Sequence, residues 1–150
     1  MAPPATEAEL GEAERALGFP LPPDAVWRRH DGSGEVLSYG CFCGLQEAIE
    51  ERDSHLEYYE GWNPHWLPIA VNGGGDCSYL DLDENSPVFG QVVGFVHDDI
   101  CDPIDSAEGT FAAWLERWVA ELERGDSYYD ADSHRFRRSG EWLFADAPDR

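Results

Sequence analysis

Four cysteines and one histidine are the residues whose types and spacing could hold a metal ion: Cys41, Cys43, Cys77, Cys101 and His97. Structural zinc usually takes two ligand pairs with two to five residues between the partners. His97 and Cys101 meet that spacing, but only one residue lies between Cys41 and Cys43. Small buried thiols explain the same residues, and a chain without a secretory signal favours free thiols. We therefore expect free cysteines and no metal or other cofactor, with zinc as the less favoured alternative.

Nucleophilic catalysis is the second chemistry to weigh. Cys77, His97 and Asp98 fall on neighbouring predicted strands, and a cysteine–histidine pair oriented by a third group is a known catalytic arrangement. No nucleophile-elbow motif surrounds Cys77. The run Gly73–Gly75 is not a phosphate cradle, because no lysine follows it and it lies between strands instead of before a helix. The sequence therefore predicts a protein that is not an enzyme.

The distribution of charge points to a different kind of function. The chain has ten basic and 31 acidic residues, and the 64 residues between Arg52 and Arg117 contain 13 acidic residues and no basic one. Such a field repels phosphate backbones and anionic membranes and attracts basic proteins. We therefore expect a protein partner, and no nucleic acid or membrane. The candidate partner-binding residues are Trp62, Asp76, Asp81, Asp83, Glu84, Asp98, Asp99 and Asp102.

Length and composition indicate one globular domain over residues 1–150. A hydrophobic fraction of 42% and an aromatic fraction of 13% are too high for a disordered chain. No apolar run approaches the roughly 20 residues that span a bilayer. The first residues have neither a basic side chain nor an apolar stretch, so we expect no secretory signal and a cytoplasmic location. The sequence does not determine the oligomeric state.

Local patterns predict the order of the elements. Thr6 and Glu9 form a capping box and Gly18 provides a left-handed stop, which predicts a helix over 6–17. Turn-forming residues join the later strands closely enough to predict an antiparallel meander. The further predicted elements are a short helix over 24–30, a strand over 36–42, a helix over 45–56, and strands over 67–72, 77–82 and 91–97.

A final amphipathic helix completes the predicted fold. Its apolar stripe is predicted to lie in the core and cover one face of the sheet. We therefore expect an α+β fold, in which N-terminal helices and this last helix pack on an antiparallel sheet. Trp66 is predicted to pack over the sheet, and Trp62 to be an exposed anchor. In the tail from 126 onward, residues 135–138 and 142–144 form either a hairpin or an added edge strand. The stripe consists of Phe111, Trp114, Leu115, Trp118, Val119 and Leu122.

Several phrases in the sequence together resemble a known family. A Leu-Gly-x-x-Leu-Pro phrase ends the first helix, an Asp-Gly turn follows, and Trp-x-Pro-Ile-Ala leads through glycines and aspartate to Leu-Asp-Leu. In this order they are similar to the SUKH superfamily, in its Smi/Knr branch, which is related to a yeast cell-wall assembly regulator. The phrases lie at 17–22, 31–32, 66–70, 73–76, 79–82, 90–92, 95–98 and 110–112.

The resemblance covers about residues 6–124, and it implies an α+β fold without a known catalytic residue set. Bacterial members of the family are regarded as immunity proteins that neutralise toxins of polymorphic systems, often nucleases, by direct binding. This implies a basic toxin domain as the partner, which agrees with the acidic stretch. The alternative is a regulatory or scaffolding module without a toxin partner. The tail after Gly125 and the Cys41/Cys43 pair do not match the family pattern.

Overall fold

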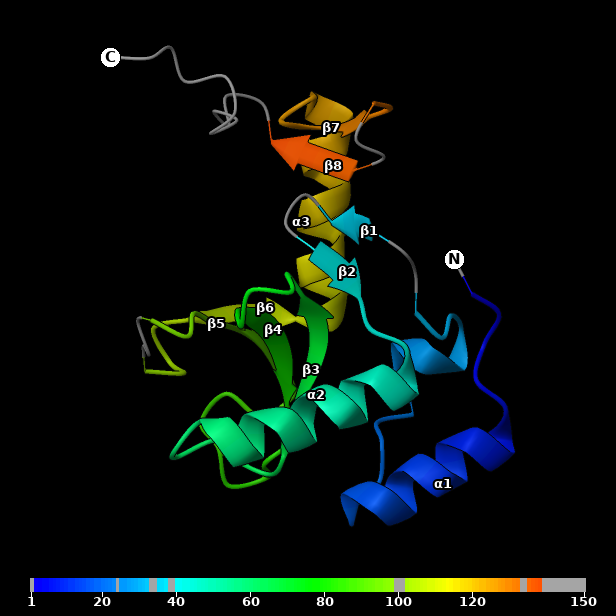
Figure 1. Ribbon diagram of the computed structural model, residues 1–150, viewed down its shortest axis with the longest axis vertical. Coiled ribbons are helices and arrows are strands. Elements are labelled where there is room, and N and C mark those ends of the chain that lie inside the picture. The colour runs from blue at the N-terminus through cyan, green and yellow to red at the C-terminus, as the bar shows by residue number, and fades with distance from the viewer. Residues whose placement is uncertain are drawn as a thin grey trace.

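The computed structural model has an α+β fold whose main sheet is an antiparallel meander (Figure 1). It describes residues 2–23, 25–32, 35–37, 40–98, 102–132 and 135–138, and for 35–37, 40 and 135–138 only the backbone. The six strands of the main sheet follow the order of the chain, as predicted, and a two-stranded sheet follows the last helix. The elements are α1 (Glu7–Leu17), a 3₁₀ turn η1 (Val26–Arg28), β1 (Glu35–Leu37), β2 (Gly40–Phe42), α2 (Leu45–Tyr58), β3 (Trp66–Val71), β4 (Cys77–Asp81), β5 (Gln91–Phe95), β6 (Ala107–Thr110), α3 (Phe111–Arg124), β7 (Ser127–Asp130) and β8 (Arg135–Arg138).

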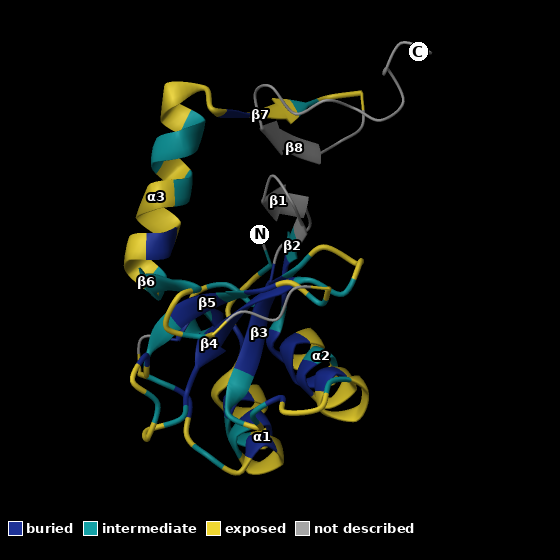
Figure 2. Cartoon of the chain, turned by 90° about the vertical axis from the view of Figure 1, so that its left-hand side faces the viewer, coloured by how far each residue is buried: buried dark blue, intermediate teal, exposed yellow. Residues whose placement is uncertain are grey.

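Helix α1 confirms the predicted capping box. The Thr6 hydroxyl accepts a hydrogen bond from the Glu9 backbone N–H at 3.3 Å, and the Glu9 carboxylate accepts one from the Thr6 N–H at 2.7 Å. Gly18 ends the helix with φ of 82°, in the left-handed region. At the start of α2, the Leu45 N–H donates to the Asp31 carboxylate at 2.6 Å. These bonds fix α1 and α2, which pack on one face of the sheet (Figure 2).

The middle of the main sheet, from β3 to β5, is buried on both faces. Along β4, alternate side chains point to opposite sides, so that Leu80 joins the core beneath α1 and α2 while Tyr79 joins a second core. On β5, Val92 likewise joins the first core and Val93 joins the second. Every residue of β4 is buried. The middle of the sheet therefore offers no open face to a partner.

The second core is built by the loop between α2 and β3, and it corrects the prediction for Trp62. Trp62 is only 6% exposed. Its ring centroid lies 5.3 Å from that of Tyr79 and 5.1 Å from that of Phe95. Trp66 stacks on Tyr79 at 4.7 Å, which confirms that it packs over the sheet. The prediction of an exposed Trp62 is wrong, because the loop folds back to cover aromatic side chains of β4 and β5.

Helix α3 is present as predicted, but only part of its apolar stripe is buried. Trp114 lies in the core, whereas Leu115 and Val119 are 38% and 41% exposed. A helix of 14 residues is about 21 Å long, and Figure 2 shows α3 extending away from β6 toward β7. The helix thus continues beyond the edge of the core. The prediction that the whole stripe is buried is therefore wrong for Leu115 and Val119.

Three shorter differences concern strands. The single strand predicted over 36–42 is two antiparallel strands, β1 and β2. Strand β6 was not predicted, and it pairs with β5 as the last strand of the meander. Residues 135–138 form strand β8, which pairs with β7, and this pairing was not predicted. Residues 142–144 lie outside the described part of the chain.

Candidate functional site

The structure separates the predicted partner-binding acids into two groups at opposite ends of β4. Asp76, Asp98 and Asp102 lie where β4 begins and β5 ends, and Asp83 and Glu84 follow the other end of β4. Five residues of strand span about 15 Å, so the groups do not form one cluster. The predicted residue Asp99 lies outside the described residues.

Asp81 is fully buried and is therefore not available to a partner, contrary to the prediction. Its carboxylate accepts hydrogen bonds from the Ser86 hydroxyl at 2.7 Å and the Trp66 indole N–H at 3.2 Å. The backbone N–H of Asp83 donates a third bond at 2.9 Å. Asp81 thus fixes the turn that follows β4 and ties it to the aromatic core. Its role in the structure is to hold this turn in position.

At that turn, Asp83 and Glu84 differ in what they offer to a partner. One oxygen of Asp83 accepts from the backbone N–H of Asn85 at 3.0 Å, and the other accepts from the Asn63 side chain at 2.7 Å. The bond from the Asn85 backbone, followed by that from Asn63, holds the pKa of Asp83 below its usual range. The Glu84 side chain is exposed. Glu84 is consequently the acid of this group that a partner can reach most directly.

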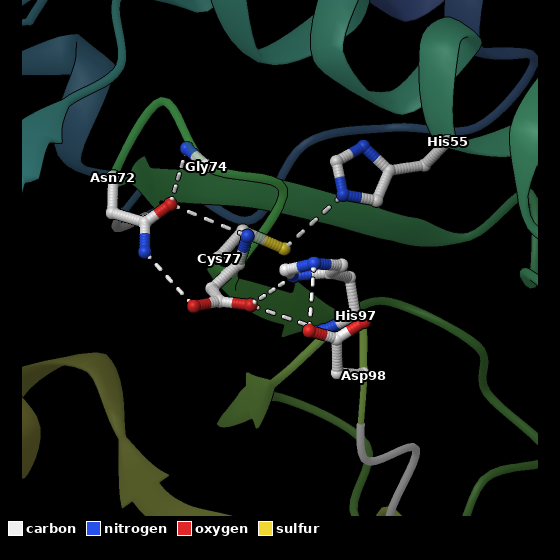
Figure 3. A network of polar contacts seen from close by, with 7 residues as sticks. His55, Asn72, Gly74, Cys77, His97 and Asp98 are labelled. Atoms are coloured by element: carbon white, nitrogen blue, oxygen red, sulfur yellow. Dashed lines mark hydrogen bonds and ion pairs between the residues drawn. The ribbon is translucent and has the colours of Figure 1, made fainter.

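At the opposite end of β4, His97 links two acids (Figure 3). Its Nδ1 lies 2.7 Å from Asp76 Oδ1, and its Nε2 lies 3.2 Å from Asp98 Oδ2. Asn72 donates to the other oxygen of Asp76 at 2.9 Å. The hydrogen bond with His97 is the main reason that the pKa of Asp76 is lowered and the pKa of His97 is raised. This network connects the turn between β3 and β4 to the end of β5.

A small hollow lies beside this network. Its volume is about 100 Å³, well below the roughly 300 Å³ at which pockets for drug-sized ligands begin. It can hold a few water molecules, and it is too small for a typical metabolite. Its lining residues are Glu51, His55, Val71, Gly73, Gly75 and Asp76.

Cys77 has a histidine neighbour, but it is His55 and not His97, which was considered for nucleophilic catalysis. Its Sγ lies 3.7 Å from Nε2 of His55, whose Nδ1 contacts the Glu51 carbonyl oxygen at 2.8 Å. Burial raises the pKa of the Cys77 thiol far above its usual value. The thiol therefore stays protonated at neutral pH and is a poor nucleophile. His55 could have been found from its spacing, because it continues the buried stripe of α2 three residues after Arg52.

The described residues contain no group of three or more His, Cys, Asp or Glu side chains that could hold a metal ion. Cys41 is half-buried and Cys43 is buried, while Cys101 lies outside the described residues. Within the described chain, no helix has the length and apolar character to cross a membrane.

Comparison with protein families gives a match over residues 4–117 to the model of the SMI1 / KNR4 family (SUKH-1). No curated protein matches the chain. The matched region begins before α1, contains both acidic groups, and ends within α3, so that β7 and β8 lie beyond it. It covers more than half of the sequence. The chain therefore belongs to the SMI1 / KNR4 family (SUKH-1).

Proposed function

We propose that this chain is an immunity protein that binds a cognate toxin domain and neutralises it, through acidic loops at the two ends of β4. The family includes immunity proteins, and this supports the general class. The observation that carries the proposal is the exposure of the acids. Of the 13 acidic residues between Arg52 and Arg117, Asp81 is buried, Asp99 is not described, and the other eleven are exposed or half-buried.

The two arginines that border this stretch offset only two of its 13 acids. The guanidinium of Arg52 is largely buried and lies 2.7 Å from the carboxylate of Asp53. Arg117 lies 3.2 Å from the carboxylate of Glu108. Each positive charge is thus matched by an adjacent acid. The loops between them present a negative potential that attracts a basic protein and speeds its association.

The spacing of the two acidic groups fits one protein interface. A partner that buries about 800 Å² covers a patch roughly 30 Å across, which is wide enough to include both ends of β4. A nuclease toxin needs a basic surface to bind the phosphate backbone of its substrate. A protein with two acidic loop groups can compete for that surface. We therefore propose a basic toxin domain, such as that of a nuclease, as the partner.

Charge reversal at both ends of β4 tests the acidic-loop part of this proposal. Asp105 lies three residues after Asp102, and its backbone N–H donates to the Asp102 carbonyl at 3.0 Å. Glu84→Lys combined with Asp105→Lys therefore changes one exposed acid at each end. We expect association with the cognate toxin domain, to be sought in the adjacent reading frame, to slow by about tenfold at low salt, because steering is lost. The difference should shrink at 0.5 M salt, where screening is strong. Association and dissociation rates at both salt concentrations provide the measurement.

The matched control is Glu12→Lys combined with Glu123→Lys, which makes the same charge change at exposed positions of α1 and α3. We expect this control to slow association much less than the loop variant. Equal slowing by both variants would mean that overall charge, and not its location, governs binding. An unchanged rate in both would contradict electrostatic steering. A chain that binds no neighbouring toxin but does bind a housekeeping protein would instead support the regulatory alternative.

A further inference from the structure

His97 lies between two carboxylates that belong to different segments of the chain. Asp76 is in the turn between β3 and β4, and Asp98 is in the segment that follows β5 (Figure 3). The distances are 2.7 Å from Nδ1 to Asp76 and 3.2 Å from Nε2 to Asp98. Both ring nitrogens therefore face an ionisable oxygen at the same time.

This geometry determines how many protons the ring must hold. An ionised carboxylate can only accept hydrogen bonds, and a neutral imidazole has only one N–H. Only an imidazolium ring can therefore donate to Asp76 through Nδ1 and at the same time form an ion pair with Asp98 through Nε2. A neutral ring that keeps its proton on Nδ1 holds Asp76, but it turns the lone pair of Nε2 toward the negative charge of Asp98.

We propose that His97 is a protonation-dependent staple that joins the β3–β4 turn to Asp98 when the ring is charged and releases Asp98 when it is neutral. The backbone N–H of His97 also donates to Asp76, at 3.0 Å. This bond does not depend on the ring, so the turn stays attached in both states. Asp98 is the partner that the neutral ring releases, and its side chain is 85% exposed.

The surroundings of His97 keep the ring in place. Gly75 has φ of 101°, and a Cβ added there would lie 3.2 Å from His97 Cγ and 3.0 Å from the Tyr59 hydroxyl. The turn thus packs closely on the ring. Among the described residues, the ionisable groups that face His97 are Asp76, Asp98 and the Tyr59 hydroxyl. Two further ionisable side chains, Glu51 and His55, line the neighbouring hollow.

The direction of each pKa shift gives the pH range in which the staple is complete. The pKa of His97 is raised, so its stabilising contribution is full below about pH 6.5 and is lost as pH rises through the raised value. The pKa of Asp76 is lowered, so its contribution is full above about pH 4 and is lost as pH falls through the lowered value. The staple is therefore complete between about pH 4 and pH 6.5.

The staple stands independently of the proposed function, but it has a consequence for it. When His97 is neutral, Asp98 becomes a free carboxylate on one of the acidic loop groups. When His97 is charged, part of that negative charge is neutralised within the chain. A basic partner would therefore meet a more negative surface at neutral than at mildly acidic pH.

An NMR titration of the His97 ring in the full chain tests the staple without any partner. We expect both ring nitrogens to be protonated at pH 5.5 and the pKa to lie above the usual value near 6.5. Asp98→Asn should lower that pKa, and Asp76→Asn should lower it further. Asp105→Asn is the matched control, because it removes an equal charge from the nearby loop that precedes β6, and it should have a much smaller effect.

The carboxyl carbon of Asp98 provides a second readout. In the unmodified chain its chemical shift should change again at the pH where His97 titrates, and this second change should be absent in His97→Gln. The proposal would be overturned by a His97 pKa at its usual value, or by equal changes of that pKa in Asp98→Asn and Asp105→Asn. It would also be overturned if the chemical shift of the Asp98 carboxyl carbon did not change at the pH where His97 titrates. The amide spectrum of each variant verifies that it is folded.

Discussion

Replacing Trp62 with Ala is expected to lower the free energy of unfolding by about 3–5 kcal/mol. The indole is 6% exposed and packs against His55, Trp66, Tyr79 and Phe95. Its removal leaves a cavity in the second core, between the loop and the sheet, that these rings can fill only in part. Urea denaturation followed by circular dichroism measures the loss.

Tyr58→Ala is the matched control, because this neighbouring aromatic side chain is 73% exposed. We expect it to change the free energy of unfolding by less than about 0.5 kcal/mol. Trp62→Phe should be intermediate, since it keeps part of the apolar contact. A loss below about 1 kcal/mol for Trp62→Ala would contradict the structural role of Trp62 and would restore it as a candidate contact for a partner.

Replacing Asp81 with Ala is the second change with a large expected effect. It removes the acceptor for the Ser86 hydroxyl, the Trp66 indole N–H and the backbone N–H of Asp83. A buried donor without an acceptor costs about 1–3 kcal/mol, and the three donors can rearrange only in part. We therefore expect a loss of about 2–4 kcal/mol in the free energy of unfolding, measured by the same denaturation.

Two further variants serve as comparisons for Asp81→Ala. Asp81→Asn keeps one carbonyl oxygen and should cost less than Asp81→Ala. Glu84→Ala changes an exposed acid in the same turn and should cost less than about 0.5 kcal/mol. Equal stability of Asp81→Ala and Glu84→Ala would show that Asp81 does not organise the turn.

The helices and strands that could be predicted are those whose signals lie in residues close together in the sequence. The capping box of Thr6 and Glu9 defines the start of α1 without any tertiary contact. The turn residues between β3, β4 and β5 likewise predict the meander. Strand β6 lacks such a signal, because Ala107–Thr110 has no apolar alternation and includes a glycine. It becomes a strand through its pairing with β5.

The burial of single side chains depended on contacts that no local pattern contains. The segment around Trp62 has the composition of a loop, and only the packing against Tyr79 and Phe95 makes it part of a core. Helix α3 shows the opposite case. Its regular stripe predicts burial, but Leu115 and Val119 extend beyond the core and are exposed.

For the acids, the alternation of side chains along β4 distinguishes a buried residue from an exposed one. Asp81 follows Cys77 and Tyr79 at alternate positions of β4, and side chains at alternate positions of a strand point to the same face. This parity places Asp81 with a buried tyrosine, whereas Glu84 lies beyond the strand in the turn. Of the acids predicted to bind a partner, the accessible ones that the structure describes thus lie in loops, and the sheet between them supports those loops.

The central claim is that this chain neutralises a basic toxin domain by direct binding through its acidic loops. The most direct measurement is the activity of the cognate toxin domain, to be sought in the adjacent reading frame, titrated with the purified chain. We predict that activity falls to background near a one-to-one ratio, and that Glu84→Lys with Asp105→Lys needs a large excess while Glu12→Lys with Glu123→Lys does not. Full toxin activity in the presence of excess chain would contradict the claim.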